Sequence, residues 1–309
     1  MNIIKDQIVI DKDFEMISNI KKNINIILEL GKVRITTFVA ISSSLGFILF
    51  SGKISLNIII PTIGVFLLAC GSSAFNHYQE RETDAKMERT KTRPIASGLV
   101  TPLYGLATAS FLSISGLALI YFSSNFTAML LGIVALIWYN IIYTPMKKVN
   151  ALAVVPGSVI GALPPMIGYA AAGGSPFDLQ IITVALFFFI WQIPHFWLLL
   201  LIHNKDYEKA GFPTLTKKFS DSQLSRITFI WIAALAVSGL LIPVFSVAPN
   251  IFSLFAVIIL GLWLLFETYG IVTKYLERSV IRKAFLIINL YVLIITVIIS
   301  IDKLLLTEI

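Results

Sequence analysis

Three oxygen-bearing side chains recur at regular spacing after the second long apolar stretch of the sequence. Asn76, Glu80 and Asp84 are each four residues apart. Each step of four along an α-helix turns the side chain by only about 40°, so the three form one stripe on a helix face. Such a stripe suits a hard divalent cation, and Mg²⁺ prefers a few carboxylates together with phosphate oxygens.

Positive charges follow this stripe at once. Arg89, Lys91 and Arg93 lie in the next nine residues, and arginine and lysine at close range bind phosphate. Acids for a metal beside cations for phosphate predict a ligand made of a metal and a diphosphate. The alternative is a solvated helix end whose acids and bases pair only with one another.

A second polar loop follows the sixth apolar stretch, from His203 to Pro213. Here Asp206 is a candidate for a second metal or diphosphate contact, and Lys205 and Lys209 are candidates for holding phosphate. Spacing alone favours these roles no more than it favours an ordinary charged loop.

The sixth apolar stretch itself contains His195, three residues after Gln192. Polar side chains in a span normally face protein or a cavity. A histidine there can bind iron, move a proton or form a hydrogen bond between helices, and the sequence leaves these roles open. Nearby aromatic residues can line an apolar groove or simply pack.

Composition shows which elements must position these residues. Apolar residues make up 57% and charged residues 13% of the 309 positions, against about 45–50% and about 25% in soluble domains. We therefore predict an all-α polytopic membrane protein with about nine transmembrane helices in one bundle. The predicted spans are residues 34–52, 56–75, 103–121, 126–144, 153–172, 179–202, 227–247, 251–268 and 284–302. Prolines within several of them predict kinked or broken helices.

The domain organisation is simple. Residues 1–31 are expected to form a polar N-terminal segment, with a surface helix over residues 14–30 and no cleavable signal. Residues 32–309 are expected to form one membrane domain. The single cysteine, Cys70, excludes an internal disulfide and a thiolate-rich metal site.

Sidedness follows from the basic residues. With nine spans, 22 of the 24 lysines and arginines fall on one face and only Lys53 and Lys303 on the other. The crowded face is therefore predicted to be cytoplasmic, in the inner cell membrane, and the N-terminus lies there too. Four spans separate the two polar loops, so both emerge on this face and are able to build one site. The net charge of +7 indicates that the protein binds anionic lipid or an anionic substrate rather than nucleic acid.

These motifs resemble those of the UbiA-type intramembrane prenyltransferases. The stripe and the run DAKMERTKTRP from Asp84 to Pro94 carry the general resemblance. Within that family, GALPPMIG (161–168), PHFW (194–197) and DYEKAGFP (206–213) are similar to the protoheme IX farnesyltransferase (heme O synthase) branch. Two features depart from the patterns: Glu80 replaces the usual aspartate, and Asp206 lacks the paired acid of quinone-type relatives.

The resemblance implies a reaction and its partners. Mg²⁺ at Asn76, Glu80 and Asp84, with Arg89, Lys91 and Arg93, would help farnesyl diphosphate to ionise. A vinyl group of heme B would then attack the farnesyl cation and water would complete heme O, with His195 as a contact to heme or a proton acceptor. Membrane lipid, a downstream heme-modifying enzyme and an oxidase assembly factor are the other implied partners.

Two alternatives remain at this point. One is a related prenyltransferase acting on a quinone precursor, chlorophyllide or another lipid. The other is a non-enzymatic protein, either a transporter or an assembly factor for a respiratory oxidase. A transporter would fit the interrupted helices, but it does not require an acidic stripe and a basic cluster at one mouth.

Overall fold

The protein is an all-helical bundle. A computed structural model describes residues 21–274 and 277–306. In this part of the chain nine helices are long and apolar enough to cross a membrane, and there is no strand, as predicted. The elements are α2 (Val33–Ser51), α3 (Ile59–Asp84), α4 (Pro102–Ser123), α5 (Phe126–Leu136), a π-helix (Ile137–Tyr143), α6 (Thr144–Met146), α7 (Val154–Gly157), α8 (Val159–Ala171), α9 (Leu179–Ile202), α10 (Asn204–Lys209), α11 (Asp221–Val244), α12 (Ile251–Thr268), α13 (Gly270–Thr273) and α14 (Arg278–Leu306).

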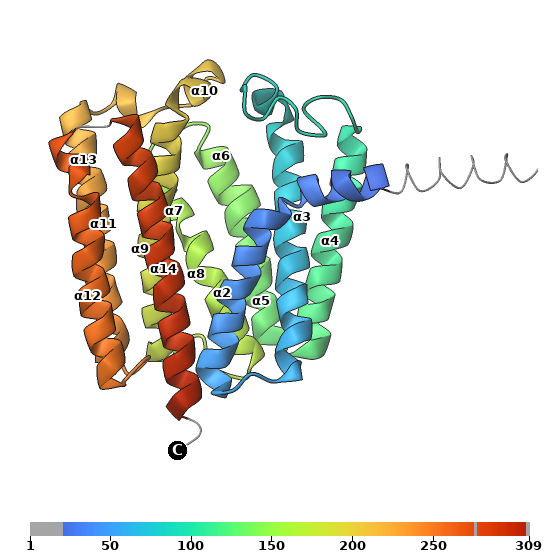
Figure 1. Cartoon of the computed structure of the whole chain (residues 1–309). Helices are drawn as coiled ribbons and strands as arrows, with labels where there is room; N and C mark the ends of the chain where they lie inside the picture. The colour runs from blue at the N-terminus through green and yellow to red at the C-terminus, as the bar shows by residue number, and fades with distance from the viewer. Residues whose placement is uncertain (1–20, 275–276, 307–309) are drawn as a thin grey trace, which may run out of the picture.

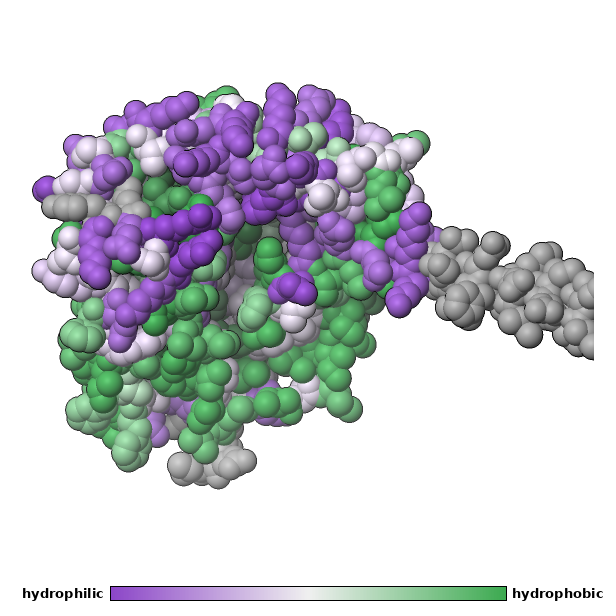
Figure 2. All heavy atoms as spheres, turned by 45° about the horizontal axis from the view of Figure 1, so that its top comes forward, coloured by the Kyte–Doolittle hydropathy of each residue, from purple (hydrophilic) through white to green (hydrophobic). Residues whose placement is uncertain are grey.

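The long helices stand side by side, and the polar loops gather at one end of the bundle (Figure 1). The loop of residues 85–101 and α10 both lie at the top of that view, while the C-terminal end of α14 lies at the bottom. Figure 2 shows hydrophilic residues concentrated over this top face and hydrophobic residues on the sides below it. The bundle therefore has one strongly polar end, which carries both candidate loops.

Small residues bring pairs of helices into backbone contact. A Cβ added to Gly116 of α4 would lie 2.6 Å from the backbone nitrogen of Leu68 in α3. A Cβ added to Gly168 of α8 would collide with the carbonyl group of Ser43 in α2. Between membrane helices, where lipid is as apolar as the side chains, close packing of this kind drives association. The tight pairs α3–α4 and α2–α8 hold the helices that surround the site.

Two spans depart from regular α-helix. The fourth contains the π-helix Ile137–Tyr143, and such segments occur frequently at functional sites. The fifth is interrupted at Ser158, between α7 and α8 and two residues after Pro156. The prolines inside α8 and α9 lie in uninterrupted helix. The predicted interruption therefore occurs at Pro156, where the span approaches the polar end.

The segment before the first span packs onto the bundle. Residues 21–30 are helical, and residues 1–20, which include the predicted start of the surface helix, lie outside the described residues. Ile26 and Leu30 are buried against residues of α3 and α4, whereas Ile24 and Leu28 are exposed. The helix therefore has one face on the protein and one apolar face directed outward, as a helix at a membrane surface would.

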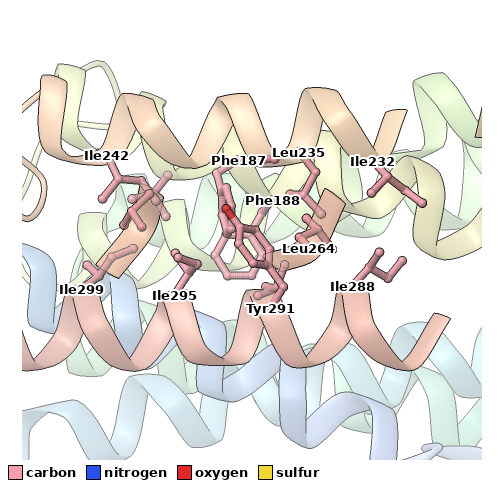
Figure 3. Packing of buried hydrophobic residues seen from close by; sticks show 14 of the residues in the cluster. Phe187, Phe188, Ile232, Leu235, Ile242, Leu264, Ile288, Tyr291, Ile295 and Ile299 are labelled. Atoms are coloured by element: carbon pink, nitrogen blue, oxygen red, sulfur yellow. The ribbon is translucent and has the colours of Figure 1, made fainter. Parts of the chain in front are cut away.

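The C-terminal half of the bundle has an apolar core. Figure 3 shows Phe187 of α9, Leu235 of α11, Leu264 of α12 and Tyr291 of α14 converging between their helices. All four are fully buried. This half contains long regular helices and fixes the position of α9, which carries His195.

Candidate active site

The acidic stripe lies on a single helix, because α3 continues beyond its apolar part as far as Asp84. The predicted second span ends at residue 75, so the helix is longer than the hydropathy pattern indicates. Asn76, Glu80 and Asp84 are each no more than 4% exposed. Carboxylates are almost never buried to this degree unless they are paired or hold a metal.

Each member of the stripe has a partly buried cationic neighbour. The Nζ of Lys147 lies 2.7 Å from Glu80 Oε1 and 2.9 Å from Oε2. Arg93 donates to Asp84 Oδ2 at 2.7 Å. The Nζ of Lys32 donates to the amide oxygen of Asn76 at 3.3 Å. Lys32, Arg93 and Lys147 thus come from three separate segments and converge on one helix face.

Burial makes this group of charges sensitive to an incoming anion. The pKa of Lys32 is lowered to about 7 by burial and by the neighbouring charges of Arg93 and Lys147. Burial also lowers the pKa of Lys147, but the adjacent Glu80 carboxylate outweighs this effect and holds that pKa above the usual lysine value. An anion beside Lys32 would raise its pKa and favour its charged form, so three cations would then face two carboxylates.

The sequence singled out Arg93 but neither lysine. Lys32 precedes the first span and Lys147 follows the fourth, so both read as basic residues that set membrane orientation. Their only local signal is that they flank spans next to the polar end. Recognising them requires the packing of α2 and α6 against α3, because Lys147 is 67 residues from Glu80 in the chain.

The donor set fits a hard divalent cation completed by ligand oxygens. Asp84 Oδ1 is buried and has no hydrogen-bond partner among the described residues. Over the same residues, no group of three or more histidine, cysteine, aspartate or glutamate side chains is close enough to hold a metal. A metal here would therefore take Glu80, Asp84 and the Asn76 amide oxygen together with oxygens of a diphosphate. Asp206 joins no such cluster, and its ligand role stays a prediction.

The predicted basic cluster is divided between two environments. The side chain of Arg93 is 14% exposed and turned to Asp84. Lys91 is exposed and pairs with Glu88 at 2.6 Å, and Arg89 is also exposed. The fixed contact at the acidic stripe is therefore that of Arg93, while the other two stand at the rim.

The two polar loops meet, as the shared face predicts. Met87 of the first loop is buried against Ala210 and Phe212 of the second. Burial lowers the pKa of His203, with a further lowering from the charge of Arg89, so Arg89 lies near the second loop. Lys205 and Lys209 are exposed on this second loop and Asp206 is half-buried. All the candidate loop residues thus lie at one mouth.

A network of amides joins the π-helix to α3. The Ser72 hydroxyl donates to Asn140 Oδ1 at 2.7 Å, and the Asn140 amide donates to the Ser72 carbonyl at 3.0 Å. The Gln79 amide donates to the Asn140 carbonyl at 2.8 Å. This network fixes the span that presents Lys147 to Glu80.

His195 lies across the bundle, against α14. Its Nδ1 is 2.7 Å from Asn289 Oδ1, and the Asn289 amide nitrogen donates to the Phe285 carbonyl at 2.5 Å. Because that amide nitrogen is committed, Oδ1 faces the imidazole and Nδ1 must carry the proton. Nε2 is therefore the acceptor. The rings of Trp191 and Phe285 lie 4.8 and 5.0 Å from the imidazole.

The fold and this site define an intramembrane protein with a buried acid–cation cluster at one mouth. The chain matches the UbiA prenyltransferase family over residues 35–291 and belongs to that family. Protoheme IX farnesyltransferase of Geobacter sulfurreducens is 44% identical over 60% of this chain and 69% of its own. The protein of the same name from Oleidesulfovibrio alaskensis is 32% identical over 89% and 95%.

Solved structures of low sequence identity share the fold. A digeranylgeranylglyceryl phosphate synthase superposes with a TM-score of 0.74 at 15% identity, over 92% of this chain and 99% of that one. A UbiA homologue from Archaeoglobus fulgidus, solved with GPP and Mg²⁺, gives 0.64 at 15% identity, over 85% and 99%. The family match and the buried cluster together identify an intramembrane prenyltransferase.

Proposed function

We propose that this protein transfers a farnesyl group from farnesyl diphosphate to a vinyl group of heme B and so forms heme O. The observation that carries the proposal is the buried cluster of Glu80, Asp84, Arg93 and Lys147 at the mouth of a UbiA-family bundle. Similarity to proteins named protoheme IX farnesyltransferase supports heme as the acceptor.

In this proposal Asn76, Glu80 and Asp84 hold Mg²⁺, and the ion supplies charge neutralisation to the diphosphate. Arg93, Lys147 and Lys32 then exchange their present partners on α3 for diphosphate oxygens. Arg89, Lys91, Lys205 and Lys209 attract the anion at the rim, and Asp206 is the candidate for a further metal contact. Preorganised charges that act on a leaving group in a site of low dielectric constant are the largest catalytic term in many enzymes.

The acceptor is proposed to lie between α3 and α9. His195 is seven residues from the end of α9, or about 10 Å below the mouth at 1.5 Å per residue. Its free Nε2 has the lone pair needed to bind heme iron or accept a hydrogen bond, and Asn289 holds the ring in place, as orienting partners of metal-binding histidines do. This favours a heme contact over a purely structural histidine.

The reaction is proposed to take place at the cytoplasmic face of the inner membrane. The 22 basic residues on the face that carries both loops support this orientation. The product is a membrane-soluble heme, so a heme-modifying enzyme or an oxidase assembly factor in the same membrane is the expected recipient. Reporter fusions after residues 100 and 215 should both report the cytoplasmic side, and opposite readings would contradict a shared mouth.

The test uses purified protein with heme B, farnesyl diphosphate and Mg²⁺, followed by product masses. The expected product carries one farnesyl group and one hydroxyl group more than heme B, and EDTA should abolish its formation. Prenylation of a quinone precursor with heme unchanged would overturn the proposal.

A second measurement addresses His195. His195→Ala should weaken heme binding, seen as a loss of the absorption change on titration, while the affinity for farnesyl diphosphate is unchanged. Asn289→Leu should also reduce the absorption change on heme titration, but by less than His195→Ala. The imidazole is still present in this variant and lacks only the partner that orients it. Normal heme spectra in both variants would remove His195 from the acceptor site.

A further inference from the structure

A line of polar side chains on α3 continues below Glu80 and Asp84. Ser73, His77, Glu80 and Asp84 are spaced i, i+4, i+7 and i+11. At about 100° per residue they fall within about 60° of one another on the helix. Asp84 and Glu80 lie nearest the mouth, and His77 and Ser73 continue the line for two more turns into the bundle.

This stripe faces the interior. Gly71, about 160° away on the helix, packs against α4: a Cβ there would lie 2.7 Å from the Ser113 backbone nitrogen. On one side of the stripe Cys70 contacts Thr36 of α2 at 3.3 Å. On the other side Ser72 contacts Asn140 of the π-helix at 2.7 Å. The stripe therefore faces away from α4, between the contact with α2 and the contact with the π-helix.

The deeper half of the stripe has unused hydrogen-bonding capacity. Ser73 Oγ and both ring nitrogens of His77 are buried and have no hydrogen-bond partner among the described residues. Side chains at least 94% buried, as these are, are nearly always hydrogen-bonded, so each such group calls for an explanation. Thr228 and Thr296, also buried in helices, donate instead to the carbonyl four residues earlier.

Groups of this kind suit a small polar ligand. A neutral imidazole has one donor and one acceptor, and a hydroxyl has both. Residues four apart on a helix have Cβ atoms about 5–6 Å apart, a span that one water molecule bridges. A buried water typically makes about three hydrogen bonds to otherwise unsatisfied polar groups. His77 and Ser73 together offer the donors and acceptors that one bound water molecule needs.

The depth of this pair matches one step of the reaction. His77 is three residues below Glu80, or about 4.5 Å along the axis. The carbon released from the diphosphate starts beside Glu80 and Asp84, so the new carbon–carbon bond forms near that depth. Lys32 and Arg93 also lie close enough to His77 to act on it electrostatically.

We propose that His77 and Ser73 hold the water molecule that completes the product, an inference that rests on the proposed farnesyl transfer. The carbon–oxygen bond to diphosphate breaks, and the acceptor's vinyl group bonds to the farnesyl carbon, which leaves a cation on the carbon next to the porphyrin. The bound water adds its oxygen to that cation, and its proton passes to the diphosphate. Without positioned water the cation loses a proton from the adjacent carbon and gives an alkene, lighter than the normal product by one water.

The ratio of alkene to alcohol among the products tests this proposal, and it does not depend on the overall rate of the reaction. Ser73→Ala and His77→Leu should raise the ratio of alkene to alcohol by about tenfold or more, the factor expected when a barrier rises by roughly 1.4 kcal/mol. His77→Gln keeps a donor and an acceptor and should give a ratio closer to wild type. Isotopically labelled water should appear in the alcohol formed by wild type.

Ser225→Ala is the matched control, since Ser225 Oγ is equally buried and unpartnered but lies on α11 in the other half of the bundle. Its product ratio should equal that of wild type. An unchanged ratio in both Ser73→Ala and His77→Leu would overturn the proposal, as would a ratio that shifts equally in Ser225→Ala. If His77→Leu does not fold, Ser73→Ala, which removes one atom, decides the matter. Failure of wild type to modify heme at all would instead overturn the proposed function.

Discussion

The two halves of this bundle differ in the side chains that they bury. Around α3 the interior contains buried carboxylates, amides and a histidine, with partly buried cations beside the carboxylates. Between α9, α11, α12 and α14 it contains mainly aliphatic and aromatic side chains, among them Tyr291 (Figure 3), and its buried polar groups are mostly hydroxyls, with the carboxylate of Asp302 near the opposite end. Buried polar groups cost free energy unless they are hydrogen-bonded or paired. The polar groups around α3 therefore lower the stability of the first half in return for a binding site, while the second half stabilises the arrangement of the helices.

The difference also shows how each half is held together. Apolar burial gains little between membrane helices, because lipid is apolar too, so the second half depends on close packing. The first half adds backbone contacts at Gly116 and Gly168 and ion pairs across helices. Variants in the two halves should therefore fail in different ways: loss of activity near α3, and loss of stability near Tyr291.

The largest effect is expected at Asp84. Asp84→Asn removes a metal-binding charge and leaves Arg93 without its partner, so turnover should fall by about 10³-fold or more while the protein still inserts into the membrane. Specific activity per folded molecule and metal-dependent binding of farnesyl diphosphate provide the measurement. Activity within tenfold of wild type would show that the polar half is not the catalytic half.

Next is the ion pair of Glu80 and Lys147. Lys147→Met leaves a buried carboxylate unpaired, and breaking such a pair costs roughly 3–5 kcal/mol of stability. The double variant Glu80→Gln with Lys147→Met should recover much of that loss, since neither charge remains, yet stay inactive. Thermal unfolding in detergent and turnover separate the two effects. If the double variant recovered both thermal stability and turnover, the ion pair would have a structural role only.

In the apolar half the expected effect is of similar size but different kind. Phe187→Ala removes a fully buried ring, and such truncations cost about 3–5 kcal/mol. Turnover per folded molecule should remain within about twofold of wild type. A fall in turnover that exceeds the fall in folded protein would show that the frame and the site are coupled.

A smaller effect is expected for Glu80→Asp. The change keeps the charge and restores the residue that the family pattern usually has, but shortens the reach toward Lys147. Turnover should fall less than tenfold, with the dependence on Mg²⁺ concentration moved more than the maximal rate. Complete loss would show that the longer side chain is matched to Lys147.

The smallest effect is expected at the rim. Lys91 pairs with Glu88 in an exposed ion pair at 2.6 Å, and such pairs contribute about 0–1 kcal/mol. Lys91→Ala should leave thermal stability unchanged and reduce the affinity for diphosphate slightly, more at low salt than at high salt. The matched variant Arg93→Ala should reduce that affinity far more, because the Arg93 side chain is only 14% exposed and pairs with the buried Asp84.

Much of this protein is determined by its sequence alone. Long uncharged stretches predict nine spans, and the structure has nine such helices in its described part. The period of the α-helix places Asn76, Glu80 and Asp84 on one face, and α3 extends far enough to include all three. These features depend on composition and local spacing, which a sequence displays directly.

What the sequence does not determine is which distant residues complete the site. Lys147 meets Glu80 across 67 residues, and Asn289 meets His195 across 94. In the sequence, Lys147 is indistinguishable from a basic residue that sets membrane orientation, and Asn289 is a single polar side chain within a span. Nothing in the residues that surround His77 along the chain indicates that both its ring nitrogens are buried without partners among the described residues. Only the packing of α2, α6 and α14 against α3 and α9 decides these pairings, because helix periodicity fixes the direction of a side chain but not the helix that it meets.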